Sequence, residues 1–217
     1  MHPRYQEWIR YVFDHPVTQP EWHLDCNAPS FEANETEEVQ LIELTFRNAA
    51  RDLAPFSNAQ INQGFWFLAS LAYSEHLNAL RSNEVPLELR LSAIDSISSL
   101  YRGCFASRCS HTLIVSDDKP SSDLNPICYM FWDVATLSNL VGNPDEEALA
   151  NACFSVLAET LQIDHPACQE AAIHGYGEFY FQYPERVAAA MDEFLQTEIA
   201  DPRLRAYATH ARTGDIM

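Results

Sequence analysis

The 217-residue sequence is poor in glycine and lysine and has no long apolar run. Six glycines stand beside twelve prolines. Because tight hairpins need residues with positive φ, this composition counts against a fold rich in β-hairpins. Lys119 is the only lysine. Since a bilayer-spanning helix needs about 20 consecutive apolar residues, we expect no transmembrane segment and no membrane partner.

The charge is strongly acidic, because 31 acidic residues outweigh 13 basic ones and leave a formal charge of −18. Such a chain repels phosphate backbones, so we expect no nucleic-acid partner. The charge favours a protein partner with a basic surface, since opposite fields speed encounter. The alternative is that the acidity reflects only the ordinary surface of an acidic soluble protein.

The cysteine count would suggest three disulfides in a short secreted chain. The start "MHPRYQEWIRYVF" lacks a charged segment followed by an apolar core, as an export signal would have. Several cysteines also fall inside apolar helical patterns, where a free thiol behaves as a small hydrophobe. We therefore expect reduced thiols and a cytoplasmic protein. The six residues are Cys26, Cys104, Cys109, Cys128, Cys153 and Cys168.

Apolar positions recur at helical spacing along most of the chain. The pattern predicts helices over 3–14, 34–53, 57–81 and 86–103, an irregular connection after the first helix, and an extended segment at "HTLIV". We expect a single α-helical domain over 1–217. Its expected parts are an N-terminal helix with a connection (1–33), helical pairs (34–108), a long loop (109–125), and two repeats with a terminal helix (126–213).

The C-terminal half carries an internal repeat of 40 residues. Residues 126–154 align with 166–194 without gaps, and the alignment matches Cys128 with Cys168 and Phe154 with Phe194. Prolines mark the expected helix starts in register, as proline is tolerated in the first turn. They are Pro126, Pro144, Pro166, Pro184 and Pro202. Two helices per unit at this period are typical of helical-hairpin solenoids.

The segment "HPACQEAAIHGYGEFYFQYPERVAAAMDEFL" resembles a HEAT-type or armadillo-like repeat. The resemblance covers about 124–213 well and the N-terminal part loosely. It implies an all-α fold, a right-handed stack of about eight to ten helices in antiparallel pairs that presents a concave face to a partner. The resemblance implies no common catalytic residues. Small residues in this segment, Ala171, Ala172 and Gly175, would let a neighbouring helix approach closely.

Glu170, His174 and Glu178 recur every four residues and would form one row on a helix. A carboxylate and an imidazole at this spacing could place an acid beside a base or bind a ligand. The outer carboxylates are about 12 Å apart along the axis, so all three cannot reach one metal ion. The alternative is a purely structural row, with His174 hydrogen-bonded at the edge of the core.

A second candidate is an acidic contact surface for a basic partner. Its members are Glu35, Glu37 and Glu38 at a helix start, with Asp117 and Asp118 in the 109–125 loop. The loop could be a lid or a partner-contact segment, or simply a tolerated insertion. The glutamates could equally reflect the preference for negative charge in a first helical turn.

Cys104, Cys109 and His111 form a C-x4-C-x-H cluster. A zinc site would need a fourth ligand, Cys128 or Cys26, supplied by the fold, and the spacing is not the usual C-x2-C hook. We expect no metal and no cofactor. The sequence also lacks a phosphate-binding glycine loop, a G-x-S-x-G elbow, an H-E-x-x-H motif and a C-x-x-C pair.

These features predict a non-enzymatic protein-interaction module. It would act as an acidic scaffold, or as an inhibitor or immunity-type binder that covers a basic partner. The alternative is an enzyme or a small-ligand-binding protein that uses a concave helical pocket.

Overall fold

The computed structural model describes residues 2–114 and 121–216, and these residues contain helices and loops but no strand. The α-helices are α1 (Tyr5–Phe13), α2 (Glu35–Asp52), α3 (Asn58–Ala69), α4 (Leu87–Asp95), α5 (Ile97–Leu100), α6 (Ala106–Arg108), α7 (Asn125–Val134), α8 (Glu146–Leu161), α9 (Pro166–Phe179), α10 (Pro184–Leu195) and α11 (Pro202–Ala211). Short 3₁₀ helices cover Trp22–Leu24 and His76–Arg81, and a π-helical turn covers Tyr101–Phe105. The prediction of an all-α fold is confirmed.

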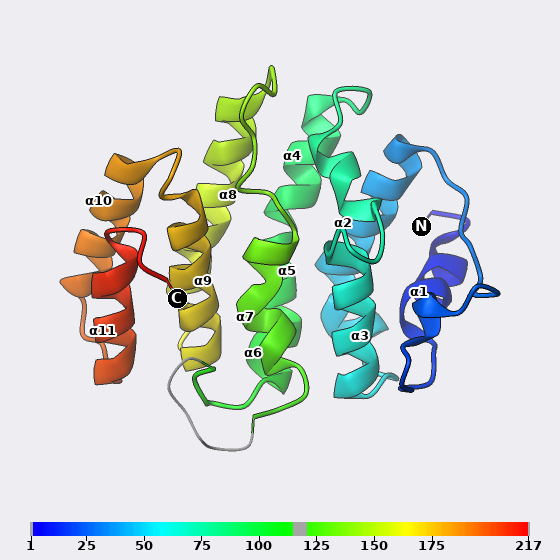
Figure 1. Cartoon of the computed structure of the whole chain (residues 1–217), viewed down its shortest axis with the longest axis horizontal. Helices are drawn as coiled ribbons and strands as arrows, with labels where there is room; N and C mark the ends of the chain where they lie inside the picture. Colours follow the sequence, from blue (N-terminus) through cyan, green and yellow to red (C-terminus); the bar gives the residue numbers. More distant parts are fainter. Residues whose placement is uncertain (1, 115–120, 217) are drawn as a thin grey trace.

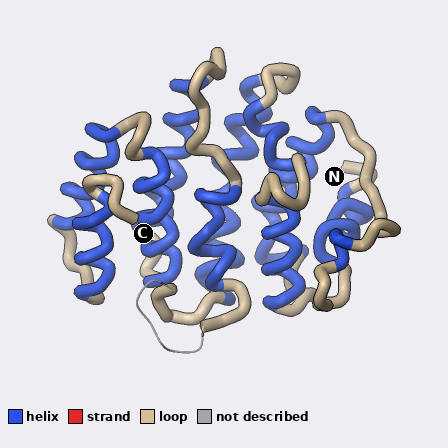
Figure 2. The backbone as a smooth tube through the Cα atoms, viewed as in Figure 1, coloured by secondary structure: helices blue, strands red, loops and turns tan. Residues whose placement is uncertain are grey.

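The helices form two layers (Figures 1 and 2). One layer contains α1, α3, α7, α9 and α11, each packed on the next. The other contains α2, α4 with α5, and α8, followed by α10, whose Arg186 bonds to Asn151 of α8 at 2.8 Å. From α7 onward the chain alternates between the two layers, and α9 packs on both α8 and α10. This packing is compatible with a helical repeat.

Local sequence explains where most helices begin. The Asn34 side chain accepts a hydrogen bond from the Glu37 backbone N–H and so caps α2. Ser57 and Gln60 form a capping box at the start of α3. Prolines occupy the first turn of α7, α9, α10 and α11, as the repeat register predicted.

The prediction of one helix over 57–81 is wrong, because α3 ends at Ala69. Ser70 adopts an extended conformation, and the hydroxyl of Ser74 donates to the Phe67 carbonyl at 2.6 Å, which ends the helical ladder. A 3₁₀ helix follows and brings His76 to Glu38 of α2, 3.0 Å away. Contacts between distant segments thus override an apolar pattern that continues in the sequence.

The helix expected over 86–103 instead continues to Arg108 through the π-helical turn. The Tyr101 hydroxyl in that turn donates to the Cys128 carbonyl of α7 at 3.0 Å. Arg108 then donates to the Leu53 and Phe56 carbonyls beyond the end of α2. In "HTLIV", the described residues 111–114 are irregular rather than extended as a strand.

Residues matched by the 40-residue alignment lie close together in α7 and α9. The Cys128 thiol donates to the carbonyl of Ala167 at 3.8 Å, next to Cys168, its match in the alignment. Ala171, Ala172 and Gly175 are all buried, as predicted. Within the described chain, none of the helices combines the length and apolar character needed to cross a membrane.

Candidate functional site

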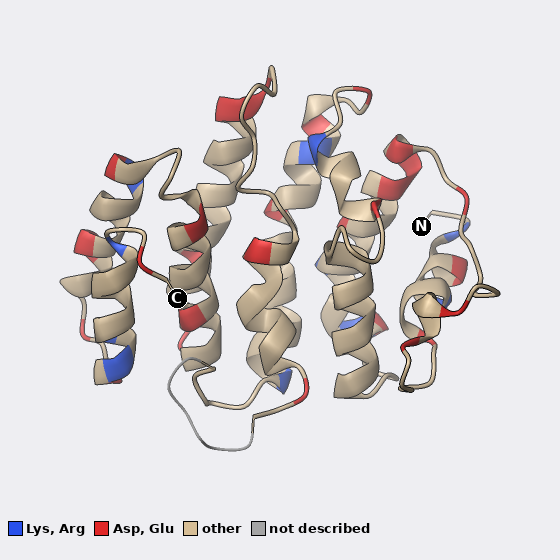
Figure 3. Cartoon of the chain, in the orientation of Figure 1, with Lys and Arg blue, Asp and Glu red and all other residues tan. Residues whose placement is uncertain are grey.

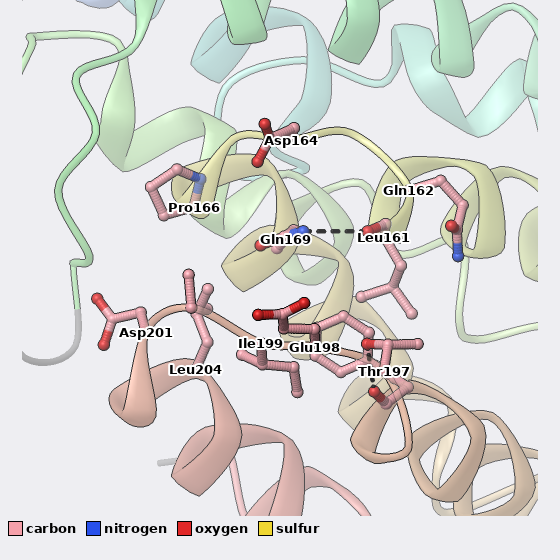
Figure 4. Close-up of a pocket in the computed structure, with 12 residues that line it drawn as sticks. Leu161, Gln162, Asp164, Pro166, Gln169, Thr197, Glu198, Ile199, Asp201 and Leu204 are labelled. Carbon is pink, nitrogen blue, oxygen red and sulfur yellow. Dashed lines mark hydrogen bonds between the residues drawn. The ribbon is translucent and has the colours of Figure 1, made fainter.

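A groove lies at one edge of the helical stack, where the α8–α9 and α10–α11 connections meet (Figure 4). Its volume is about 330 Å³. The residues that line it are Leu161, Gln162, Asp164, Pro166, Gln169, Phe194, Thr197, Glu198, Ile199, Ala200, Asp201 and Leu204. The groove is therefore built from the connections of consecutive helical pairs.

The groove combines a buried apolar floor with an acidic rim. Leu161, Phe194 and Leu204 are buried side chains of α8, α10 and α11. Asp164, Glu198 and Asp201 also line the groove and supply its carboxylates (Figure 4). None of its lining residues is lysine, arginine or histidine. This combination suits a ligand with an apolar body and a positive charge.

Two of these carboxylates belong to residues that stand just before the starts of α9 and α11. Asp164 precedes the His165–Pro166 start of α9, and Asp201 precedes Pro202 at the start of α11. Asp201 caps α11 by accepting from the Arg203 backbone N–H at 2.9 Å, and it also pairs with the exposed Arg203 side chain. Asp164 and Glu198 are exposed and keep their charge facing solvent.

The opposite edge of the molecule is also acidic (Figure 3). We call it the acidic edge and define it by five exposed glutamates near the starts of α2, α4, α8 and α10. They are Glu35, Glu84, Glu88, Glu147 and Glu185. Negative charge is favourable at a helix N-terminus, so part of this acidity stabilises the helices themselves.

All three glutamates expected at a contact surface have hydrogen-bond partners inside the protein, but only Glu35 is exposed. Glu37 accepts from Arg4 through both carboxylate oxygens at 3.3 Å. Glu38 contacts His76 at 3.0 Å. Glu35 is exposed and accepts from the Ser82 hydroxyl. Glu37 and Glu38 therefore hold the N-terminal segments together, and only Glu35 remains part of the open surface.

Asp117 and Asp118 lie outside the described residues. The described ends of the 109–125 loop are tied to the core by Asn125, a side chain that is only 1% exposed. Its amide oxygen accepts from the Ser110 backbone N–H at 2.9 Å, and its nitrogen donates to the Ser110 and Thr112 carbonyls. The loop thus leaves and re-enters the helical stack at one fixed point.

The predicted row of Glu170, His174 and Glu178 lies on α9, but its members have different surroundings. Glu170 is 1% exposed and accepts from the Ile114 backbone N–H at 2.8 Å. In this conformation it anchors the loop and cannot contact a partner. His174 is buried beside the more exposed Glu178, with 3.7 Å between Nε2 and Oε1.

The structure surrounds His174 with residues that sequence spacing did not identify. Its Nδ1 lies 2.8 Å from the Tyr207 hydroxyl of α11, which is 2.9 Å from the Tyr129 hydroxyl of α7. Burial lowers the pKa of His174. Burial, and then the charge of Asp133, raise the pKa of Glu178. The Tyr207–His174 contact spans 33 residues, so no local pattern could reveal it.

Three of the thiols gather beside the start of α9. Burial, and then the neighbouring Cys109 and Cys168, raise the pKa of Cys128. The His165 ring packs on His111 with centroids 4.1 Å apart. The hydrogen bond from Cys128 and the neighbouring His165 lower the pKa of Cys168 to about 6. In the described part of the chain, no three His, Cys, Asp or Glu side chains are arranged to hold a metal ion.

Comparison of the chain with protein-family models, with curated proteins and with solved structures finds no match. Its function must be inferred from the groove, the charged surfaces and the buried polar cluster.

Proposed function

We propose that the protein is a non-enzymatic helical-repeat interaction module, of the HEAT or armadillo kind, that binds a basic segment of a partner protein. The observation that carries the proposal is the groove between the α8–α9 and α10–α11 connections. Its floor of Leu161, Phe194 and Leu204 is apolar, and its lining includes three carboxylates and no basic residue, with Asp201 paired to Arg203 outside the lining.

The two parts of the groove have different roles in binding. Burying one apolar side chain on the floor contributes about 1.5–3 kcal/mol before the costs of association. The carboxylates of Asp164, Glu198 and Asp201 select lysine or arginine beside that apolar residue and speed association at low salt. The expected ligand is therefore an apolar residue flanked by basic ones.

The charge of the whole chain supports the same kind of partner. With a net charge of −18, the protein attracts a basic protein, and the groove provides a defined binding site. This is the physics of a scaffold for a basic protein, or of an inhibitor or immunity-type binder that covers one. Five buried free thiols suit a reducing compartment, so we place this function in the cytoplasm.

The proposal is tested with a displayed library of random peptides, selected on the purified protein at low salt. The selected peptide is then synthesised, and its dissociation constant is measured by fluorescence anisotropy across a salt series. The groove variant combines Asp164→Asn, Glu198→Gln and Asp201→Asn. Asparagine preserves the helix cap at 201. The control removes the same charge from the acidic edge through Glu84→Gln, Glu147→Gln and Glu185→Gln.

We expect selected peptides that place an apolar residue between lysines or arginines. The groove variant should bind such a peptide at least about tenfold more weakly, equal to about 1.4 kcal/mol, and with a smaller salt dependence. The control should lose no more than about threefold through the weaker overall field. Equal losses in both variants, or no enrichment of basic residues, would reject the groove as the binding site.

A further inference from the structure

A second cavity lies between the connection that follows α1, the first turns of α3 and the start of α7. Its volume is about 340 Å³, at the lower end of the range of about 300–1,000 Å³ that is typical of small-molecule sites. The cavity and the groove share no lining residue, so the two are separate sites.

Gln63 of α3 is the most deeply buried polar residue that lines this cavity. It is 3% exposed, and its Nε2 donates to the carbonyls of His15 at 3.2 Å and Pro16 at 3.3 Å. Because a carbonyl can only accept, these two bonds fix which end of the amide carries the oxygen. Gln63 Oε1 is therefore an acceptor, and it is buried without a hydrogen-bond partner among the described residues.

Asn62 adds a second amide to the same wall. It also lines the cavity, and its Oδ1 is likewise buried without a hydrogen-bond partner in the described chain. Leaving a buried polar atom unpaired is unfavourable. Two such atoms on one wall favour a ligand that brings hydrogen-bond donors.

The rest of the polar lining is negative. Glu21 and Asp123 supply two carboxylates, and none of the lining residues is lysine, arginine or histidine. His23 Nε2 lies 3.3 Å from Glu21 Oε2, but burial lowers the pKa of this histidine, so at neutral pH it brings no positive charge. The cavity therefore favours donors that carry a positive charge.

An anion is the ligand that a helix start usually attracts, and two helices begin near this cavity. The start of α3 is closed by the capping box of Ser57 and Gln60, and Asp123 already places a negative charge just before α7. An anionic ligand would therefore be repelled by the carboxylates of the lining. A metal ion also fits poorly, because the described residues contain no three His, Cys, Asp or Glu side chains arranged to hold one.

We propose that this cavity binds the ammonium group of a primary amine. An ammonium group has three N–H donors, which suit the amide oxygens of Asn62 and Gln63 and a carboxylate at the same time. Val17, Ala59 and Pro126 supply apolar lining for the attached alkyl chain. The amine is either a small free molecule or the lysine side chain of a partner protein.

The test is an NMR titration of the isotope-labelled full chain. The probes are butylamine, putrescine and the amide of Nα-acetyl-lysine. Butanol and the amide of Nα-acetyl-norleucine have similar alkyl chains without the ammonium group and serve as matched ligand controls. Ionic strength is held constant, so that the diffuse attraction of cations to a chain of charge −18 is the same in every titration.

We expect the amines to shift the backbone signals of Ala59 and Asp123 and the side-chain amide signals of Gln63 most. The variants Asn62→Ala and Asp123→Asn should each bind the amine at least about tenfold more weakly, because each loses a hydrogen bond to a charged donor. The control variant is Asp14→Asn, which removes a nearby exposed carboxylate that does not line the cavity. It should lose less than about twofold through the weaker overall field.

The probes also identify the source of the amine. Localised shifts with butylamine or putrescine identify a small free amine, and shifts with the lysine amide alone identify a side chain of a partner. The proposal is overturned if no amine causes localised shifts, if the uncharged controls cause the same shifts, or if Asp14→Asn weakens binding as much as the cavity variants. It is also overturned if calcium chloride causes the localised shifts and the amines do not.

The groove variant separates this inference from the proposed function. Asp164→Asn, Glu198→Gln and Asp201→Asn lie outside the cavity, so this variant should keep the full response to the amines. Failure of the groove and failure of the amine site are therefore distinguishable.

Discussion

Gly175 of α9 lies directly against Trp132 of α7, so that a Cβ atom at 175 would be 2.7 Å from the indole Cγ. The same atom would be 2.6 Å from Leu157 Cδ2 of α8. Trp132, Leu157 and the helix that carries Gly175 are all buried, so no neighbour can move away cheaply. The missing side chain sets the distance between three helices of the two layers.

Gly175→Ala should therefore destabilise the protein. Alanine favours the helix by about 1 kcal/mol, but the clash with two buried side chains costs about 1–3 kcal/mol or more. We expect a net loss of about 2 kcal/mol in urea unfolding. The comparison is Gly177→Ala, where the clash is with Ile216, a partly buried side chain of the non-helical segment after α11, which can shift at lower cost than two buried helical side chains. Equal losses at 175 and 177 would contradict this packing.

Asn125→Ala should loosen the 109–125 loop and lower stability by about 1–2 kcal/mol, because it leaves half-buried backbone groups of 110 and 112 without this partner. Limited proteolysis should then cut the loop faster than in the wild type. Asn139→Ala, at an exposed position, serves as the control and should change neither property. Unchanged proteolysis in Asn125→Ala would show that the loop is held elsewhere.

Glu37→Lys should lower the unfolding midpoint more than Glu88→Lys. Both glutamates lie in a first helical turn, so both variants lose the same favourable interaction with the helix N-terminus. Only Glu37 also pairs with Arg4, whose guanidinium lies 4.0 Å from the centre of the Phe31 ring. Thermal unfolding of the two variants measures the difference. A smaller drop in the midpoint for Glu37→Lys than for Glu88→Lys would show that the Glu37–Arg4 pair does not hold α1 in place.

Acidification should destabilise the protein through His174. Burial lowers the pKa of His174 in the folded protein below the usual value of about 6.5, which it keeps in the unfolded chain. Between the folded and the unfolded pKa, the unfolded chain therefore binds more protons than the folded one. Stability must then fall as the pH drops below about 6.5. Glu178 acts in the opposite direction at lower pH, because its pKa is raised. The urea midpoint of the His174→Asn variant should change less between pH 7 and 5.5 than that of the wild type. The same pH dependence in both proteins would show that His174 does not cause the loss of stability.

One thiol should react quickly with a thiol reagent under native conditions. Cys26 is exposed, while the other five cysteines are buried, and burial raises the pKa of Cys104 and Cys153 to about 12. Cys26→Ser should abolish the fast reaction. The lowered pKa of Cys168 makes it the next thiol to react once the start of α9 opens. Two fast thiols in the wild type would indicate that this region is already open.

Sequence reasoning worked where the signal is local. Pro166, Pro184 and Pro202 each begin a helix because proline fits a first turn whatever the rest of the chain does. Sequence reasoning failed to predict the end of α3 at Ala69, where no glycine or proline marks the end of the helix. This end depends on the Ser74 hydrogen bond and on contacts of the following 3₁₀ helix. The fold class follows from such repeated local signals.

The candidate sites were predicted less well than the fold. His174 and Glu178 were identified by their spacing, but Asp133 and Tyr207 come from other helices and share no spacing with them. The row also included Glu170, whose burial against Ile114 depends on the path of the loop. The groove was not predicted, because it forms only where two inter-helix connections meet.

The most direct test of the proposed function is NMR mapping of the selected basic peptide on the isotope-labelled protein. If the peptide occupies the groove, the backbone signals of Gln169, Thr197 and Leu204, which line it, should shift most, while those of the acidic edge should hardly move. The largest shifts at Glu35, Glu147 and Glu185 would contradict the groove and place the partner at the opposite edge of the molecule.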